Sequence, residues 1–478
     1  MFINTYNHNI NMTQLTAKNR EQSVKNKKLF RKDPAEEKLI IPGLKDLHTH
    51  PFIYSLLETA GITDISKCRT IGQLKDALKE KKGTGLMLAM GLDTNNLSHL
   101  TRKELDEISK DDVVIIIDPS FHGGVVNTKT AGMLAERTEG KVVKGELNEN
   151  GTWTELYLYT CLSITAETLD ENTMLEGILD WVKKQYNQGI IEIHDMAVTS
   201  AHGLRMLVEA RKAWGEDFPV TKIHGITEAL LDLSEDKKLL YDIEKYFGGI
   251  GLKLFADGSF GSYTAALYGA YNNTDKEGII VYSEDDVKEI AVLLEQHNLG
   301  DVLTDVAIHA IGDRGIDQAL RYALILNSLG DKETWLQHYE LSGDEELLAI
   351  TKHFCSVGIV SGVVMNPNFV SDIEEYTSRI GEDRIKQINP LRSILDMGIP
   401  MRFGTDGMPQ DMLRVIYDAV YHPVEEQRLT LEEALKIACG VERLEDASYT
   451  LALKGPVVNS LLEGKPYEKG EIELEKQK

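Results

Sequence analysis

Short apolar runs alternate with helical patterns along most of the chain. The runs that fit buried strands are 39–47, 86–92, 113–118, 189–194, 218–226, 250–257, 305–313, 334–338, 356–364 and 399–406. Helical patterns separate most of them, and one is predicted to begin at Ser283, which has Asp286 three residues later, as in a capping box. Repeated strand-then-helix units predict a parallel sheet covered by helices, which is the α/β class.

Ten such runs are too many for an eight-stranded barrel. The runs at 86–92 and 113–118 lie in a long stretch between the first run and the run at 189–194. If residues from about 52 to 185 form an insertion, eight strands remain, and a (β/α)8 TIM barrel is predicted. An open doubly wound sheet is the alternative, but no GxGxxG motif follows an early strand.

The two ends of the chain differ from this core. Residues 1–38 are polar and without pattern, and we expect a flexible or loosely docked N-terminal arm. The barrel is predicted over 39–443. Residues 444–478 form a C-terminal extension that ends in a charged tail, with at most one hairpin over 455–473.

Composition narrows the classes of partner. The chain has 478 residues, of which 42% are hydrophobic, and 52 basic against 76 acidic residues give a formal net charge of -24. A surface with this much negative charge repels phosphate backbones and anionic lipids. We therefore expect neither nucleic acid nor a membrane as a partner. No stretch approaches the roughly 18 apolar residues of a membrane span, and the N-terminus has no secretion signal.

The four cysteines, Cys68, Cys161, Cys355 and Cys439, lie far apart and form no CxxC spacing. A disulfide framework or a thiolate metal site would need closer or repeated spacings. Buried free thiols in a reducing, cytoplasmic setting are therefore expected.

Candidate metal-binding side chains lie at the carboxyl ends of the predicted barrel strands. In a TIM barrel this end carries the active site. His48 and His50 end the first strand and point the same way, so both imidazoles can reach one metal ion. Later strand ends carry the remaining candidate ligands, which are Lys253, His309, His338 and Asp406. Each residue alone has a structural explanation, but the chain has only 13 histidines, so their joint placement favours a metal site.

This order of HxH, Lys, His, His and Asp resembles the amidohydrolase superfamily in its two-metal, carboxylated-lysine form. Four strings, GLKLFADGSFGSYTAAL (251–267), VAIHAIGD (306–313), WLQHYEL (335–341) and SFHGGVVNTKTAGML (120–134), are similar to the branch that includes N-substituted formamide deformylase. The resemblance runs from about residue 40 to 440. Members commonly carry a small β-sandwich built from both chain ends, which the sequence here predicts to be reduced or absent.

The resemblance implies a ligand set. His48, His50 and Asp406 would hold one metal, His309 and His338 the other, and a CO2-derived carbamate on Lys253 would bridge them. Zinc suits a His-rich site, although manganese, iron and cobalt also fit. The metals would yield a bridging hydroxide that attacks an amide-type C–N bond, with Asp406 passing the proton to the leaving nitrogen.

Other residues are candidates for substrate contact or for orienting ligands. His122 matches a family position near the substrate and is a second catalytic candidate. Asp257 and Asp313 follow Lys253 and His309 and fit either ligand-orienting partners or helix caps. His194, expected at the end of strand two, and His224, on strand three, are further candidates near the pocket.

Alternative functions remain open from the sequence. A one-metal aminohydrolase that deaminates a heterocycle usually has a Glu three residues after the strand-five histidine, where this chain has Gly312. Esterase, lactonase and phosphotriesterase activities would use the same metals. A scaffold that has lost catalysis should lack ligands, yet all six are present. The substrate is expected to be a small molecule, and a homodimer is expected by family analogy.

Overall fold

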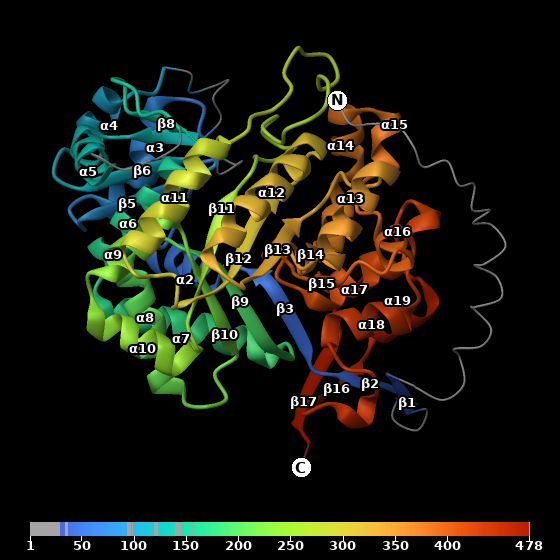
Figure 1. Cartoon of the computed structure of the whole chain (residues 1–478). Helices are drawn as coiled ribbons and strands as arrows, with labels where there is room; N and C mark the ends of the chain where they lie inside the picture. The colour runs from blue at the N-terminus through green and yellow to red at the C-terminus, as the bar shows by residue number, and fades with distance from the viewer. Residues whose placement is uncertain are drawn as a thin grey trace, which may run out of the picture.

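The computed structural model describes residues 29–33, 37–92, 97, 99–118, 123–138, 145–154 and 156–477. Its centre is a parallel sheet of eight strands in the order β15-β14-β13-β12-β11-β10-β9-β3. The strands are β3 (Leu44–Thr49), β9 (Ile190–Val198), β10 (Val220–Gly225), β11 (Ile250–Phe255), β12 (Leu303–Ala310), β13 (Glu333–His338), β14 (Gly362–Met365) and β15 (Met401–Phe403). Helices alternate with these strands, which makes the fold a (β/α)8 TIM barrel, as predicted (Figure 1).

Helices form the outer layer of the barrel. They are α7 (Glu171–Asn187), α8 (Ala201–Trp214), α9 (Thr227–Ser234), α10 (Lys237–Phe247), α11 (Glu284–Gln296), α12 (Asp313–Leu326), α13 (Glu345–Ser356), α14 (Ile373–Ile380), α15 (Glu382–Ile385), α16 (Leu391–Asp396), α17 (Met412–Val420) and α18 (Leu431–Cys439). The predicted capping box of Ser283 and Asp286 is present at the start of α11. Because α13 continues to Ser356, the seventh strand begins only at Gly362, later than the apolar run at 356–364 predicted.

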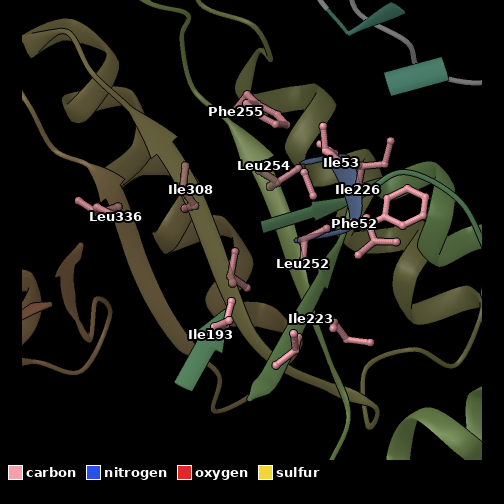
Figure 2. Packing of buried hydrophobic residues seen from close by; sticks show 14 of the residues in the cluster. Phe52, Ile53, Ile193, Ile223, Ile226, Leu252, Leu254, Phe255, Ile308 and Leu336 are labelled. Atoms are coloured by element: carbon pink, nitrogen blue, oxygen red, sulfur yellow. The ribbon is translucent and has the colours of Figure 1, made fainter. Parts of the chain in front are cut away.

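Successive side chains of β11 point alternately toward the helices outside the barrel and toward the barrel interior, where the candidate site lies. Leu252 and Leu254 are fully buried, and Figure 2 shows them in the packed layer with Phe52 and Ile226. Successive side chains of a strand point to opposite faces, so Lys253 between them faces the barrel interior. The same alternation places His309 two residues beyond Ala307, the β12 partner of Lys253.

Much of the chain between β3 and β9 forms an insertion with its own sheet (Figure 1, upper left), and this sheet shares a hydrophobic core with the barrel. A five-stranded sheet of order β4-β5-β6-β7-β8 contains β4 (Thr63–Asp64), β5 (Leu86–Met90), β6 (Val113–Ile117), β7 (Gly123–Val126) and β8 (Thr152–Thr154). The helices α3 (Ile71–Leu78), α4 (Arg102–Ile108), α5 (Thr128–Thr138) and α6 (Tyr157–Thr168) accompany this sheet, whereas α2 (Pro51–Ala60) packs on α7 and β9 of the barrel. The two apolar runs at 86–92 and 113–118 thus lie in this sheet and not in the barrel.

The two chain ends meet in a four-stranded sheet of order β1-β2-β16-β17 at the lower end of the view in Figure 1. Its strands are β1 (Arg31–Asp33), β2 (Lys38–Pro42), β16 (Tyr449–Lys454) and β17 (Glu471–Lys476). The run at 39–47 is therefore two strands that separate at Gly43, and only the second enters the barrel. Helix α19 (Pro456–Glu463) replaces the hairpin predicted over 455–473.

This small sheet fits the reduced form of the predicted β-sandwich, but the sequence did not locate its strands, because they are short and pair across the whole length of the chain. Arg31–Asp33 lies in a strand, although the sequence suggests a loose arm as far as residue 38. Among the described residues, no helix has both the length and the apolarity needed to cross a membrane. Cys68, Cys161 and Cys439 are buried free thiols, whereas Cys355 is partly exposed.

Candidate functional site

Three of the predicted ligands converge at the carboxyl end of the barrel. His50 Nε2 lies 3.0 Å from Asp406 Oδ1, and His48 Nε2 lies 3.4 Å from the same oxygen. One ligand atom from each residue falls within 4.8 Å of the others, as a shared metal ion requires. His48 Nε2 and His50 Nδ1 are buried and have no hydrogen-bond partner. Such unpartnered nitrogens fit a group that accepts a metal.

The backbone brings the first and last barrel strands into contact at this point. The Asp406 amide donates to the His48 carbonyl at 2.7 Å. A Cβ built at Gly404 would lie 2.6 Å from the His48 backbone nitrogen, so only glycine permits this approach. Asp406 has φ 55° and His338 has φ 67°, in the left-handed region that residues other than glycine seldom adopt. Such strain concentrates at functional sites.

His309 and His338 continue the group next to His48. The His338 ring centroid lies 4.5 Å from that of His48 and 4.5 Å from that of His309. On its other side His338 stacks on Phe369 at 5.9 Å. The four predicted histidines therefore form one continuous cluster, although the compact set within 4.8 Å contains only His48, His50 and Asp406.

Hydrogen bonds fix which nitrogen each imidazole presents. His48 Nδ1 donates to Gln337 Oε1 at 2.7 Å, and His338 Nδ1 donates to Asn366 Oδ1 at 2.9 Å. His309 Nε2 donates to the Gly258 carbonyl at 2.9 Å. Such contacts hold the ring and its tautomer in the way that metal-binding histidines need. Gln337 and Asn366 escaped prediction, because an amide side chain near a strand end carries no distinguishing spacing.

Asp46 is a further residue that the sequence did not single out. It is buried on β3, and its carboxylate accepts hydrogen bonds from the Thr405 amide at 2.9 Å and the Thr405 hydroxyl at 2.6 Å. Burial raises the pKa of Asp46 to about 7, although both Thr405 contacts oppose the shift. Asp46 thereby positions the turn that carries Asp406.

Lys253 lies inside the barrel with 2% of its surface exposed, and its Nζ lies 5.1 Å above the Phe255 ring. Burial lowers the pKa of Lys253 to about 7, against the opposing charge of Asp406. Its charge also acts on His48 and His338, which places it beside the histidine cluster. An appreciable fraction of the amine is therefore neutral near neutral pH.

The same burial keeps the imidazoles uncharged. Burial and the charge of Lys253 lower the pKa of His48 to about 4, and burial with the neighbouring histidines holds the pKa of His338 well below its usual value. Burial alone would raise the pKa of Asp406, but its contacts with His48 and His50 outweigh burial and hold it well below the usual range. Neutral imidazoles beside an ionised carboxylate match the needs of a divalent cation.

Asp257 and Asp313 anchor loops next to the cluster. Asp257 accepts the amides of Ile311 at 3.0 Å, Gly312 at 2.8 Å and Ala266 at 2.9 Å, and its Oδ1 is 3.7 Å from His309 Nε2. Asp313 instead accepts the Tyr268 amide at 2.9 Å and is the first residue of α12, whose N-cap makes no side-chain bond. Neither aspartate is therefore an N-cap.

The structure does not bring His194 and His224, the two further candidates near the pocket, together with His48, His50 and Asp406. Strand β9 continues to Val198, so His194 lies in its middle and contacts Glu192 at 3.3 Å. His224 contacts Asp305 at 3.0 Å near the start of β12. Both histidines thus lie toward the amino end of the barrel. His122, the remaining candidate, lies outside the described residues.

A cavity adjoins Lys253. The insertion contributes Tyr159 and Thr160 of α6 and Leu156 just before it, and the barrel contributes Phe255, Tyr282 and Glu228. Tyr159 packs against Phe255 with ring centroids 5.3 Å apart. The insertion therefore forms part of the wall beside the histidine cluster.

The amidohydrolase family model matches residues 35–440, which is most of the chain. The chain belongs to the amidohydrolase family. This amidohydrolase is 22% identical over 404 residues to YtcJ of Bacillus subtilis, a match that covers 80% of the chain and 73% of that protein. It is also 22% identical over 407 residues to LONG AFTER FAR-RED 3 of Arabidopsis thaliana, covering 78% of the chain and 66% of that protein, just under two thirds of its length.

Solved structures show the same fold. An uncharacterized metal-dependent hydrolase from Pyrococcus horikoshii OT3 has a TM-score of 0.62 and 22% identity, covering 88% of this amidohydrolase and 87% of that chain. A second uncharacterized metal-dependent hydrolase, from Pyrococcus furiosus, has a TM-score of 0.59 and 24% identity. This match covers 84% of this amidohydrolase and 81% of that chain. Both likenesses support the barrel architecture.

Proposed function

We propose that the protein is a metal-dependent hydrolase that cleaves an amide-type C–N bond in a small molecule. The observation that carries the proposal is the convergence of His48, His50 and Asp406, with Lys253 buried beside them. The family and the solved relatives described as metal-dependent hydrolases support the same chemistry.

His48, His50 and Asp406 would hold one divalent ion, and His309 and His338 a second. Lys253 would join the two sites after its neutral amine adds to CO2, because a carbamate offers two oxygens and a negative charge. The pKa of about 7 for Lys253 leaves enough neutral amine for that addition. Two divalent ions, zinc by the preference of imidazole ligands, would supply a Lewis acid for the carbonyl and an acidified water.

Asp406 is the residue that we assign to proton transfer. Its carboxylate lies 3.0 Å from His50 Nε2 and is ionised, because its pKa is held well below the usual range. An ionised carboxylate can take a proton from the attacking water and deliver it to the leaving nitrogen. Amide cleavage needs that delivery, since an unprotonated amine anion leaves poorly.

Two measurements test this proposal. Metal analysis of protein purified without chelator should find about two ions per chain, and a hydrolysis screen over N-acyl, N-formyl and cyclic amides should find turnover with the loaded protein. Metal-free protein that regains no activity on loading, with any member of the panel, would contradict it. Mass spectrometry after exposure to 13CO2, with chemical trapping, should locate the carbamate on Lys253.

A mononuclear aminohydrolase is the second candidate, because the compact ligand set comprises only His48, His50 and Asp406. The buried Lys253 argues for two metals, since a one-metal site has no use for a bridging group. One ion per chain, with activity that survives Lys253→Met, would favour the aminohydrolase. We also propose a cytoplasmic location from the free cysteines.

A further inference from the structure

Glu340 lies in the loop after β13, and one oxygen of its carboxyl group is buried without a hydrogen-bond partner. Only 1% of its surface is exposed, and its Oε1 makes no hydrogen bond. An unpartnered buried polar group costs about 1–3 kcal/mol, and more when it is charged. Native proteins seldom keep such a group unless it meets an ion or a ligand.

Asn389 is a second unpartnered residue in the segment that runs beside Glu340. Its amide donates to the Glu340 carbonyl at 2.8 Å, and a bridge between Leu341 and Ile388 aligns the two segments. Asn389 is 1% exposed, and neither its side-chain oxygen nor its side-chain nitrogen has a hydrogen-bond partner. Two aligned segments thus each bury polar atoms that no part of the described chain satisfies.

Burial raises the pKa of Glu340 well above its usual range, and three negative charges raise it further. They come from Asp372, Asp257 and Asp406. Asp372 is exposed, and the Tyr376 hydroxyl lies within reach of the charges of Asp372, Glu340 and Asp406. The acidic groups therefore extend from the surface to the proposed metal ligand, and their combined field favours a cation.

We propose that Glu340 and Asn389 bind a cationic, donor-rich group of the substrate, of the guanidinium or ammonium type. N–H groups of such a cation would satisfy Glu340 Oε1 and the Asn389 side-chain oxygen, and its charge would offset the acidic surroundings. Glu340 lies outside the compact set of possible metal ligands, so an organic cation fits better than a metal ion.

This inference rests on the proposed function, because the bound group belongs to the molecule that is hydrolysed. Glu340 lies two residues beyond His338, so a cation bound here would fix the substrate at a short, constant distance from the scissile bond. Phe369 and Tyr376 provide aromatic surface nearby, since Phe369 stacks on His338 and Tyr376 packs on Phe260 at 5.2 Å. A short apolar stem between the cation and the scissile bond would suit these rings.

The test compares two probes of the same shape and different charge. Titration calorimetry of the metal-loaded protein in physiological salt, with butylguanidinium and with the neutral N-butylurea, should show about ten-fold tighter binding of the cation. Glu340→Gln should abolish that preference. Glu345→Gln removes the same charge from the exposed start of α13 and should keep it.

Equal affinity for the two probes, or a preference that persists in Glu340→Gln, would overturn the proposal. If Glu340→Gln does not fold, Asp372→Asn at the exposed rim takes its place and should reduce the preference about two- to three-fold. An unchanged preference in Asp372→Asn would then count against the site. Because calorimetry needs no turnover, a retained preference without hydrolysis would refute the proposed reaction alone.

Discussion

Both ends of the barrel interior contain His, Lys and Asp side chains. These side chains are paired at the amino end, whereas some ring nitrogens at the carboxyl end lack a hydrogen-bond partner in the described part of the chain. At the amino end, Asp305 meets His224 at 3.0 Å and Lys222 at 3.2 Å, so each charge has a partner. At the carboxyl end, His48 Nε2 and His50 Nδ1 are buried without a hydrogen bond. Composition alone does not distinguish these regions.

The difference teaches that satisfaction of hydrogen bonds, and not residue type, marks a functional site. Lys222 is 31% exposed and paired with two carboxylates, whereas Lys253 is buried and lacks such a pairing in the described structure. Burial without partners is unfavourable, so a protein retains it only where a ligand completes the arrangement. The amino end is therefore assigned to stability and the carboxyl end to chemistry.

The largest effect should come from Asp406→Asn, which removes the proposed proton acceptor and one of the proposed metal ligands. We expect kcat/KM to fall by about 10³-fold or more, while the melting temperature changes little because the amide keeps the shape. Activity, metal content and thermal unfolding would be measured together. Asp285→Asn, at an exposed position on α11, is the matched control, and near-normal activity of Asp406→Asn would contradict the assigned role.

Asp305→Asn tests the other end of the barrel. It removes the carboxylate from His224 and leaves the partly exposed Lys222 with Glu333 alone, so we expect a loss of about 2–3 kcal/mol in unfolding free energy. The activity of the folded protein should stay within about three-fold of the wild type, since the change lies away from the metal ligands. A large loss of activity in Asp305→Asn at unchanged stability would contradict the assignment of the amino end to stability and the carboxyl end to chemistry.

Gln337→Met asks whether the hydrogen bond to His48 orients a ligand. Loss of this 2.7 Å contact should weaken metal binding about 10- to 100-fold in competition with a chelator. Gln296→Met on the exposed end of α11 is the control. Unchanged metal affinity in Gln337→Met would mean that His48 needs no orienting partner.

The smallest expected effect is the contribution of His194 to the loss of stability at acidic pH. Burial lowers the pKa of His194 to about 4, so between pH 6.5 and 4 the unfolded chain takes up a proton that the folded chain refuses. Stability is therefore lost as pH falls through this window. His194→Gln should make that loss smaller, by about 1–2 kcal/mol at pH 5 in urea unfolding. An identical pH dependence would show that His194 does not contribute to acid unfolding.

The sequence predicts the barrel and the candidate ligands because both follow from local pattern. Alternation identifies the strands, and the position of His48, Lys253 or His309 relative to a strand end follows from the same pattern. The extent of a strand is less visible, which is why His194 was expected at an end and lies in the middle of β9.

Residues whose role depends on a distant partner could not be predicted. Gln337 matters because it meets His48, and Glu340 stands out only because nothing meets it. The four-stranded sheet escaped for the same reason, since β2 pairs with β16 from the other end of the chain. Long-range pairing leaves no local mark on either segment.

His50 and Asp406 are separated by 356 positions in the sequence. Nearly the whole barrel must therefore be synthesised before the proposed metal ligands His48, His50 and Asp406 can come together. A nascent chain should remain unable to capture its ion until the eighth strand has docked beside the first. Acquisition of the ion would then report that synthesis and closure are complete, so that truncated translation products stay inert.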